Sequence, residues 1–256
     1  LVDALKRLEY RGYDSAGVAT VYNGQLGRRR AEGKLRNLED LLKRDPLPGD
    51  TGIGHTRWAT HGKPTESNAH PHMTDLVSVV HNGIIENFRE LKQELSSRGA
   101  SFTSDTDTET IAHLITQELI GGNDPVRATF NALRRLRGAF ALAMIFRGYN
   151  DLMIVARQGS PLAIGYGDGE MFVGSDAIAL APFTDAIAYL EDGDWAVLTR
   201  KGVAIRDRAG RPVERAVTRS LATALMVDKG NHRHFMAKEI HEQPEVIGHT
   251  LAAYVD

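Results

Sequence analysis

The spacing of apolar residues predicts alternating helices and strands over the first half of the chain. Leu1, Leu5 and Leu8 recur at helical spacing, and Asn23-Gly24 between two extended runs is typical of a hairpin turn. A continuous apolar run at 76–81 indicates a strand that is buried on both faces. The expected helices cover 1–9, 35 to just before Pro46, 88 to Gly99, and 125–136; the expected strands cover 16–22, a run from 25, 51–56 and 76–81.

A further helix is predicted to begin at the segment T-D-T-E, residues 106–109, which has the form of a capping box. Thr106 would cap the helix and Glu109 would reach back to it. Apolar residues at 111, 114, 115 and 119 would form its buried face. The acidic run 105–109 lacks the glycine and the loop length of an EF-hand, so capping explains it better than calcium.

After Gly138 the pattern changes to short strands separated by turns. Such spacing favours antiparallel pairing. Helices grouped between two strand-rich segments favour an α+β fold over a doubly wound parallel sheet. Residues 207–233 are polar and lack periodicity, which is typical of a linker, and residues 239–256 are again helical in pattern. We therefore expect one domain over 1–206, followed by a linker with a helical segment over 207–256. The expected strands are 139–146, 152–156, 162–166, 171–174, 186–190, 196–199 and 203–206.

Composition narrows the class of protein. The 256 residues are 42% hydrophobic and 25% charged, which are ordinary globular values. A net charge of -2 gives no electrostatic case for nucleic acid or an anionic membrane. We interpret the run Arg28-Arg29-Arg30 as a solvated face or a strand end. The chain has no cysteine, which excludes disulfides and zinc–thiolate sites.

No targeting segment is visible. The apolar run 139–146 is too short to span a bilayer, and no signal peptide is recognisable, so a cytoplasmic protein is expected. Leu1 opens directly into a helical pattern without an initiator Met, and the final helical pattern simply stops. We therefore expect the sequence to be a fragment of a longer protein.

The polar stretch from His55 to Asn87 carries the candidate chemistry. Arg57 follows a predicted strand, where its guanidinium could grip a carboxylate in a bidentate manner or form a structural salt bridge. Asp107 begins a predicted helix, where the helix dipole alone would stabilise it. Together the two charges favour a site for a zwitterionic amino acid, with Arg57 on the α-carboxylate and Asp107 on the α-ammonium.

Asn82-Gly83 ends the second predicted buried strand. A hairpin turn is one interpretation, but the residues that follow do not resemble a returning strand. The other interpretation is an oxyanion hole, in which the Asn82 amide and the Gly83 backbone N–H face a developing negative oxygen. Glycine suits such a position because the backbone must come close to the ligand.

Four histidines, His55, His61, His70 and His72, could suggest a metal site. No carboxylate is placed as a third ligand, and the proline between the last two stiffens that pair. Hydrogen-bonded structural histidines are therefore the preferred interpretation over a metal hydrolase.

Seven motifs together span nearly the whole chain. They are E-Y-R-G-Y-D-S-A-G (9–17), H-T-R-W-A-T-H-G (55–62), N-A-H-P-H (68–72), H-N-G-I-I-E-N (81–87), S-D-T-D-T-E (104–109), R-G-A-F-A (137–141) and H-F-M-A-K-E-I-H-E-Q-P (234–244). The same motifs occur in this order in the glutamine–fructose-6-phosphate aminotransferase family. The chain resembles the N-terminal glutaminase domain of that family, a class II (N-terminal-nucleophile) amidotransferase.

The resemblance implies a fold and a reaction. The fold would be a four-layer αββα sandwich of two antiparallel sheets. A cysteine would attack the side-chain amide of L-glutamine with its own α-amine as base, and water would release glutamate from the thioester. Ammonia would pass through a channel to fructose 6-phosphate in a C-terminal isomerase domain of the same polypeptide, giving glucosamine 6-phosphate in hexosamine biosynthesis. No cofactor is implied, and the full-length protein would be a homodimer.

The resemblance also implies residue roles. Arg57 would bind the α-carboxylate of glutamine, Asp107 its α-ammonium, and Asn82 with Gly83 would form the oxyanion hole. Trp58 would be the channel gate within a mobile loop. The remaining implied residues are Thr60 and His61 beside the substrate and Arg11 next to the amine of the nucleophile.

One departure from the family pattern affects catalysis. The opening strand C-G-I-V-G, which supplies the nucleophile, has no counterpart in residues 1–256, and Leu1 aligns within the helix that follows that strand. The sequence as it stands would hold most of the glutamine pocket but not the nucleophile. The alternatives are a non-catalytic module that binds glutamine or a partner, and another class II amidotransferase such as amidophosphoribosyltransferase.

Overall fold

The computed structural model describes residues 1–9, 12–58, 63–220 and 235–254. Its helices are α1 (Val2–Lys6), α2 (Leu35–Arg44), the 3-10 helix η2 (Glu66–Asn68), α3 (Phe88–Ser97), α4 (Thr108–Ile120), α5 (Pro125–Leu133), α6 (Ala177–Leu180) and α7 (Phe235–Tyr254). Its strands are β1 (Ser15–Tyr22), β2 (Gln25–Glu32), β3 (Thr51–Arg57), β4 (His72–Met73), β5 (Val77–Ile85), β6 (Gly138–Phe146), β7 (Met153–Gln158), β8 (Ala163–Tyr166), β9 (Met171–Gly174), β10 (Ala186–Tyr189), β11 (Trp195–Thr199), β12 (Gly202–Arg206) and β13 (Val217–Arg219).

The described strands form three sheets in which every pair of neighbours is antiparallel. The largest sheet has the order β12-β11-β7-β6-β5-β4. The other two have the orders β2-β1-β3 and β13-β10-β8-β9. This pairing confirms the antiparallel α+β prediction.

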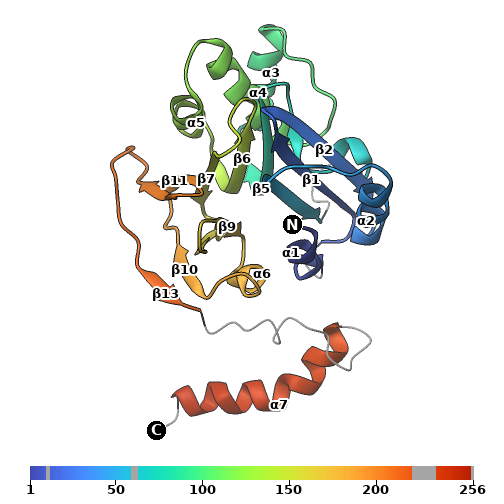
Figure 1. The fold of residues 1–256 in the computed structure, drawn as a ribbon, viewed down its shortest axis with the longest axis vertical. Coiled ribbons are helices and arrows are strands. Elements are labelled where there is room, and N and C mark those ends of the chain that lie inside the picture. Colours follow the sequence, from blue (N-terminus) through green and yellow to red (C-terminus); the bar gives the residue numbers. More distant parts are fainter. Residues whose placement is uncertain (10–11, 59–62, 221–234, 255–256) are drawn as a thin grey trace.

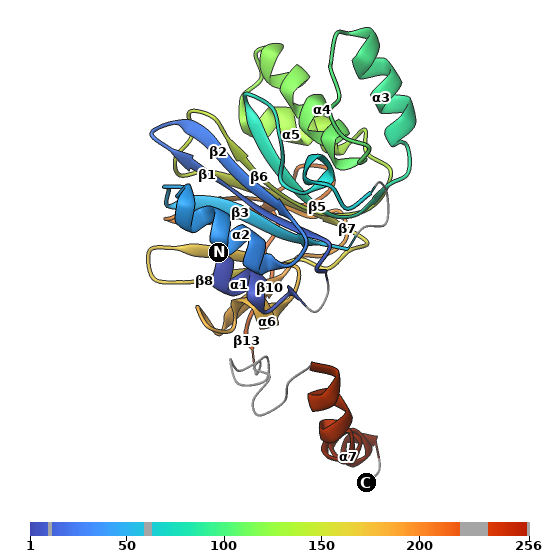
Figure 2. The ribbon, with the colours of Figure 1, turned by 90° about the vertical axis from the view of Figure 1, so that its right-hand side faces the viewer.

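The layers follow an α-β-β-α order, which Figure 1 shows from the front and Figure 2 from the side. Helices α3, α4 and α5 cover one face of the six-stranded sheet, and the two smaller sheets face its other side. Helices α1 and α2 cover the outside of β1, and α6 covers the outside of β8 and β10. The long helix α7 lies apart from the sandwich (Figure 1).

Strand β6 shows why the central strands are apolar throughout. Its alternate residues from Phe140 to Phe146 face the helices, whereas Ala141, Ala143 and Ile145 face the smaller sheets. Both sets are buried, because side chains alternate between the two faces of a strand and each face meets a core. Ala141 and Ala143 line a cavity between the sheets.

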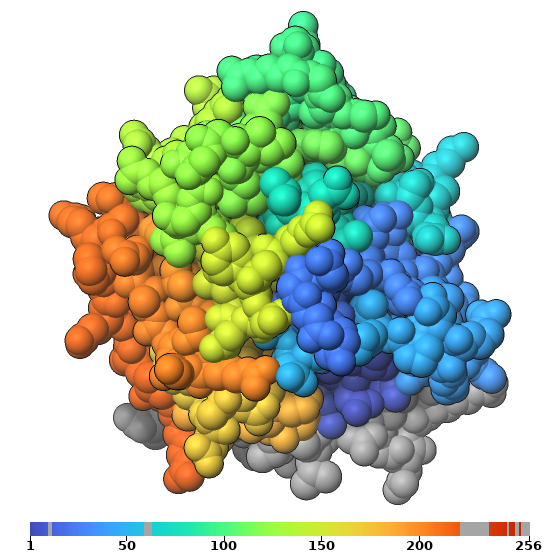
Figure 3. All heavy atoms as spheres, turned by 45° about the horizontal axis from the view of Figure 1, so that its top comes forward, coloured from blue at the N-terminus to red at the C-terminus, as the bar shows by residue number. Residues whose placement is uncertain are grey.

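Two turns that are far apart in the sequence pack together at one end of the sandwich. Asn23 and Gly24 both have positive φ, 49° and 74°, as a two-residue hairpin loop requires. The Gly24 N–H donates to Asn150 Oδ1 at 2.8 Å, and the Gly148 N–H donates to the Gly24 carbonyl at 2.8 Å. Figure 3 shows the two turns side by side, one blue and one yellow.

Most predicted elements are confirmed, with shifted ends. The first helix covers Val2–Lys6, not 1–9, and α5 ends at Leu133, three residues before the expected end. Strand β13 lies within the predicted linker and pairs with β10, so the sheet continues past residue 206. The structure also contains β4, η2 and α6, which are too short to leave a periodic pattern.

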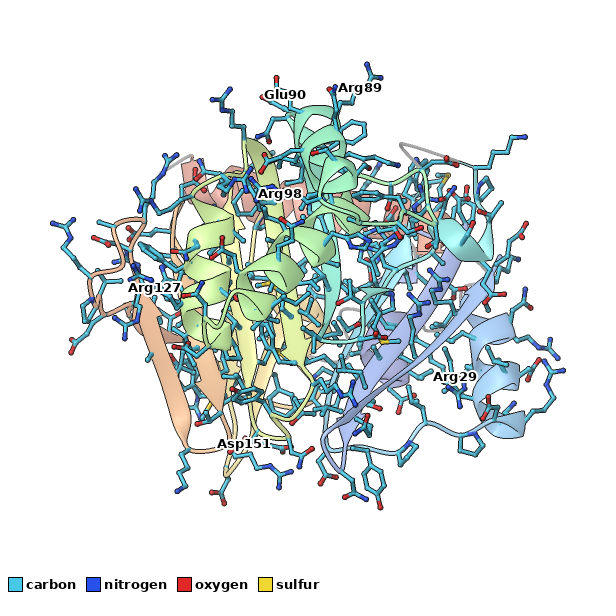
Figure 4. All side chains as sticks on the ribbon, turned by 90° about the horizontal axis from the view of Figure 1, so that it is seen from above. Arg29, Arg89, Glu90, Arg98, Arg127 and Asp151 are labelled. Atoms are coloured by element: carbon cyan, nitrogen blue, oxygen red, sulfur yellow. The ribbon has the colours of Figure 1, made fainter. Side chains whose placement is uncertain are left out.

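The interpretation of the arginine run as a solvated face or a strand end is wrong. All three arginines lie inside β2 and are partly buried. Arg28 donates to the Pro71 carbonyl at 3.1 Å, and Arg30 donates to the Ala69 carbonyl at 2.9 Å. Arg29 points to the opposite face, toward α2, and pairs with Asp45 at 2.6 Å (Figure 4). The alternation lets β2 hold the loop before β4 from one face.

The charged residues of α3 show the opposite behaviour. Arg89 and Glu90 are exposed and point away from the sheet (Figure 4), while Leu91 and Leu95 of the same helix are buried in the core.

Among the described residues, no helix combines the length and the apolar character that a bilayer crossing requires.

Replacing a core residue should test this layer arrangement. Leu142→Ala removes a fully buried side chain from the centre of β6 and should lower the free energy of unfolding by about 2–5 kcal/mol. The control Ile120→Ala removes a side chain that is 75% exposed at the end of α4, where little change is expected. Urea unfolding measures both, and equal losses would contradict the proposed core.

Candidate active site

A cavity of about 1080 Å³ lies between the two sheet layers. It is bounded by β3 and β9, which are edge strands of the two smaller sheets. One part of its lining is apolar and includes Ile53, Val80 and Leu162. The other part brings together five of the predicted site residues, Arg57, Trp58, Asn82, Gly83 and Asp107.

Arg57 is the last residue of β3 and is 5% exposed. Its guanidinium donates to the Lys63 carbonyl at 3.4 Å. Burial lowers the pKa of Arg57, while the carboxylates of Asp14 and Asp107 act in the opposite direction. A guanidinium keeps its proton in proteins, so Arg57 places a positive charge in a buried position on the cavity wall.

Asp107 holds α4 to β5. It occupies the N-cap position of α4, but its carboxylate does not cap the helix. Instead Asp107 Oδ2 accepts the backbone N–H of Ile85 at 2.7 Å. The residue is 8% exposed, so a negative charge lies in the cavity wall at the start of a helix, where the dipole stabilises it.

The predicted capping box is therefore wrong in its details. Thr106 is not the N-cap; its hydroxyl contacts His72 Nε2 at 2.9 Å. Glu109 does reach back, but it accepts N–H groups from Thr103 and Ser104 at 2.7–3.1 Å. Burial alone would raise the pKa of Glu109, and hydrogen bonds led by His113 and Thr103 outweigh it and lower the pKa well below the usual range.

Gly83 lies within β5 and not at its end, which corrects the prediction that the strand stops at Asn82-Gly83. The strand continues to Ile85, and Gly83 has φ +139°, a conformation that favours glycine. A Cβ at this position would lie 2.0 Å from the Ala139 carbonyl oxygen. Both the conformation and the close approach to β6 therefore require glycine.

One edge of β5 is held by side chains where strand pairing ends. β4 pairs with β5 only at Ser78 and Val79. Beyond that point the His81 N–H donates to His70 Nδ1 at 3.3 Å, and the Ile85 N–H donates to Asp107. Because amides in a strand alternate in direction, Gly83 should present its N–H at the same edge, between these two.

Three of the four histidines in the predicted cluster, His55, His70 and His72, lie together, and His81 lies beside them, whereas His61 falls outside the described residues. His55 and His70 stack with ring centroids 4.3 Å apart, and His70 meets His72 edge-on at 5.0 Å. Burial is the main cause that lowers the pKa of His70, His72 and His81, and for His72 it brings the pKa to about 3. In the part of the chain that the structure describes, no three His, Cys, Asp or Glu side chains group as metal ligands.

Trp58 follows Arg57 and is 57% exposed, with its ring edge-on to Tyr13 at 5.6 Å. Its exposure beside the cavity is compatible with the expected gate, a role that stays a prediction. Arg11, Thr60 and His61 fall outside the described residues, so their expected roles also stay predictions.

The sequence did not single out Thr108, His81 or Glu109 as parts of this site's framework. Glu109 carried a signal, since an acidic residue in a first helical turn commonly accepts backbone N–H groups. For Thr108 and His81 the only signal was their place inside the polar motifs at 81–87 and 104–109.

A family model for the glutamine amidotransferase domain matches residues 55–182, half of the chain, including Arg57, Asn82, Gly83 and Asp107. The chain belongs to the glutamine amidotransferase domain family. Its sequence is 67% identical over 256 residues to glutamine–fructose-6-phosphate aminotransferase [isomerizing] of Brucella abortus biovar 1. The enzyme of that name from Mesorhizobium japonicum is 68% identical over 256 residues. These findings confirm the resemblance to the aminotransferase family that the seven motifs indicated.

The chain spans 42% of the length of these curated relatives, while they cover all of it. It corresponds to their glutamine amidotransferase part. A solved structure of glutamine phosphoribosylpyrophosphate amidotransferase from B. subtilis has a TM-score of 0.70 and 26% identity, covering 80% of this chain and 45% of that chain. The shared architecture confirms the expected sandwich fold of class II amidotransferases.

The buried histidines should make stability depend on pH. The pKa of His72 falls to about 3 on folding, so between that value and about 6.5 the unfolded state binds more protons than the native state. Stability should therefore fall as pH decreases through this range. The variant His72→Gln lacks this proton uptake. As pH decreases through this range, the free energy of unfolding of the variant minus that of the parent should therefore increase by up to about 1.4 kcal/mol per pH unit.

Urea unfolding at intervals from pH 7 to pH 4 measures this difference. Carboxylates titrate in the same range, but they are common to both proteins and largely cancel. If the difference in free energy of unfolding between variant and parent does not vary with pH, His72 binds its proton as readily in the native state as in the unfolded state.

Proposed function

We propose that this chain is the glutaminase part of a glutamine–fructose-6-phosphate aminotransferase, which releases ammonia from glutamine for transfer to fructose 6-phosphate. The observation that carries the proposal is the pair of opposite charges, Arg57 and Asp107, on one cavity wall with an open strand edge beside them. The identity of 67% to an enzyme of that name supports the acceptor sugar.

Arg57 and Asp107 suit the two ends of an α-amino acid. The guanidinium of Arg57 forms charge-assisted bonds to the α-carboxylate, and its buried position strengthens them. Asp107 Oδ2 already accepts the Ile85 N–H, and the remaining lone pairs of the carboxylate accept the α-ammonium. A substrate that lacks either charge leaves one buried ion unpaired, which disfavours its binding.

The side chain of glutamine then extends toward Asn82 and Gly83. When a nucleophile attacks the amide carbon, the carbonyl oxygen becomes negative. The Gly83 N–H at the open edge of β5 and the Asn82 side-chain amide donate to this oxygen. Loss of ammonia gives a γ-glutamyl thioester, and water releases glutamate.

The nucleophile of this reaction is a cysteine thiol, which residues 1–256 do not contain. The nucleophile and its amine base would therefore lie in the polypeptide outside these residues. The sugar site would lie in a part that corresponds to the further length of the relatives, of which this chain covers 42%. Residues 1–206 together with β13 would form the glutaminase domain, and the remaining C-terminal residues would lead into an isomerase domain of a homodimeric, cytoplasmic protein.

Within this proposal, Trp58 gates the passage of ammonia, and Thr60 and His61 lie beside the substrate. Arg11 lies next to the amine of the nucleophile. These four roles rest on the motif match to the aminotransferase family.

Removing the Arg57 guanidinium should chiefly weaken glutamine binding. In the full-length enzyme, Arg57→Ala should raise the KM for glutamine about 10- to 100-fold, because a charge-assisted pair contributes about 1.5–3 kcal/mol. The control Arg36→Ala removes an arginine whose side chain is 86% exposed on α2. Steady-state release of glutamate measures both, and an unchanged KM for Arg57→Ala would refute the assigned role.

Removing the Asn82 amide should instead slow the chemical step. Asn82→Ala should lower kcat about 100- to 1000-fold with a smaller effect on KM, since the donor acts on charge that develops in the transition state. A variant that binds glutamine normally but hydrolyses it at the parental rate would show that Asn82 is not an oxyanion donor. If the parent itself binds glutamine without releasing glutamate, the chain is a binding module.

A further inference from the structure

Two side chains hold the edge of β5 on either side of Gly83. On one side of Gly83, His70 accepts a hydrogen bond from the His81 N–H. On the other side, Asp107 accepts a hydrogen bond from the Ile85 N–H. Their bonds are 3.3 Å and 2.7 Å long. The position of the Gly83 amide therefore depends on where these two side chains are fixed, and this inference rests on the proposed function of that amide.

One hydroxyl connects the two. Thr108 Oγ1 lies 3.4 Å from His70 Nε2 and 3.4 Å from Asp107 Oδ1. It also lies 3.0 Å from Nδ1 of His81, the residue one before Asn82. Thr108 is 1% exposed, so water does not compete for these contacts.

The direction of these bonds follows from the protonation of His70. Its Nδ1 accepts a backbone N–H, and burial keeps the ring neutral by lowering its pKa, so its proton lies on Nε2. Nε2 then donates to the Thr108 oxygen. The single hydroxyl proton of Thr108 is left for His81 Nδ1 or Asp107 Oδ1. A threonine or serine hydroxyl can accept and donate at once, whereas an aliphatic side chain can do neither.

We propose that Thr108 is a positioning residue that couples the recognition of the α-ammonium to the oxyanion hole. Its hydroxyl fixes Asp107, which binds the ammonium, and through His70 and His81 it fixes the strand segment that carries Asn82 and Gly83. Thr108 itself touches no reacting atom. Loss of the hydroxyl disturbs both parts of the site together.

Thr110 provides a matched control two residues along the same helix. It is also fully buried, at 0% exposure, and its hydroxyl has no hydrogen-bond partner among the described residues. Thr110→Val and Thr108→Val therefore make the same chemical change at similar burial. They differ in whether the lost hydroxyl was engaged.

The test is steady-state glutamine hydrolysis by the full-length enzyme and its variants. Thr108→Val should lower kcat/KM roughly tenfold, with a lower kcat and a higher KM, because it removes a buried hydroxyl and leaves its partners unpaired. Thr108→Ser should restore values close to the parent, and Thr110→Val should match the parent. Urea unfolding of each variant checks that it is folded, and Thr108→Ala replaces the valine variant if that one fails to fold.

Three outcomes would overturn the proposal. Equal kinetics for Thr108→Val and Thr110→Val would show that the hydroxyl of Thr108 positions nothing. A serine variant as impaired as the valine variant would assign the effect to packing of the methyl group. A change in KM alone would show that Thr108 acts on Asp107 but not on the oxyanion hole. A parent that does not hydrolyse glutamine would instead overturn the proposed function, so the two failures are distinct.

Discussion

The candidate site depends on one edge of β5, the strand next to the end of the six-stranded sheet. β5 is buried on both faces over most of its length, and β4 pairs with its outer edge at only two positions. A buried amide that is left without a partner is costly, so side chains must take over where β4 stops. His70 and Asp107 do so, and both come from segments that the strand pairing alone would not bring here. The polar end of the cavity is built around this edge.

Electrostatics in the site follow from the same burial. Charged groups are costly in the interior unless they are paired, and neutral polar groups are cheaper. Burial lowers the pKa of His70, His72 and His81, so the histidine cluster adds no charge at neutral pH. The acidic and basic side chains of this part of the cavity are Arg57 on β3 and Asp107 at the start of α4. They offer two separated, opposite charges, which suits a zwitterion.

Much of this arrangement could be predicted from the sequence. Periodicity located the long helices and strands, and the motif order indicated the four-layer sandwich. The charges of Arg57 and Asp107 in the sequence suggested an amino-acid site. The course of β5 through Gly83 could not be predicted, because an Asn-Gly pair after a buried strand resembles a turn. Thr106 was predicted as the N-cap of α4 instead of Asp107. The Asp107 carboxylate accepts the Ile85 N–H of β5 and does not cap the helix, and this contact is visible only in the tertiary structure. The short strand β13 was missed because three exposed residues in a polar segment leave no pattern.

The most direct measurement is a crystal structure of the full-length protein with L-glutamate bound. The α-carboxylate should lie against the Arg57 guanidinium and the α-ammonium against Asp107. A γ-carboxylate oxygen should accept hydrogen bonds from the Gly83 N–H and the Asn82 side chain. Glutamate bound elsewhere, or bound here with its α-carboxylate away from Arg57, would contradict the account of this cavity as a glutamine site.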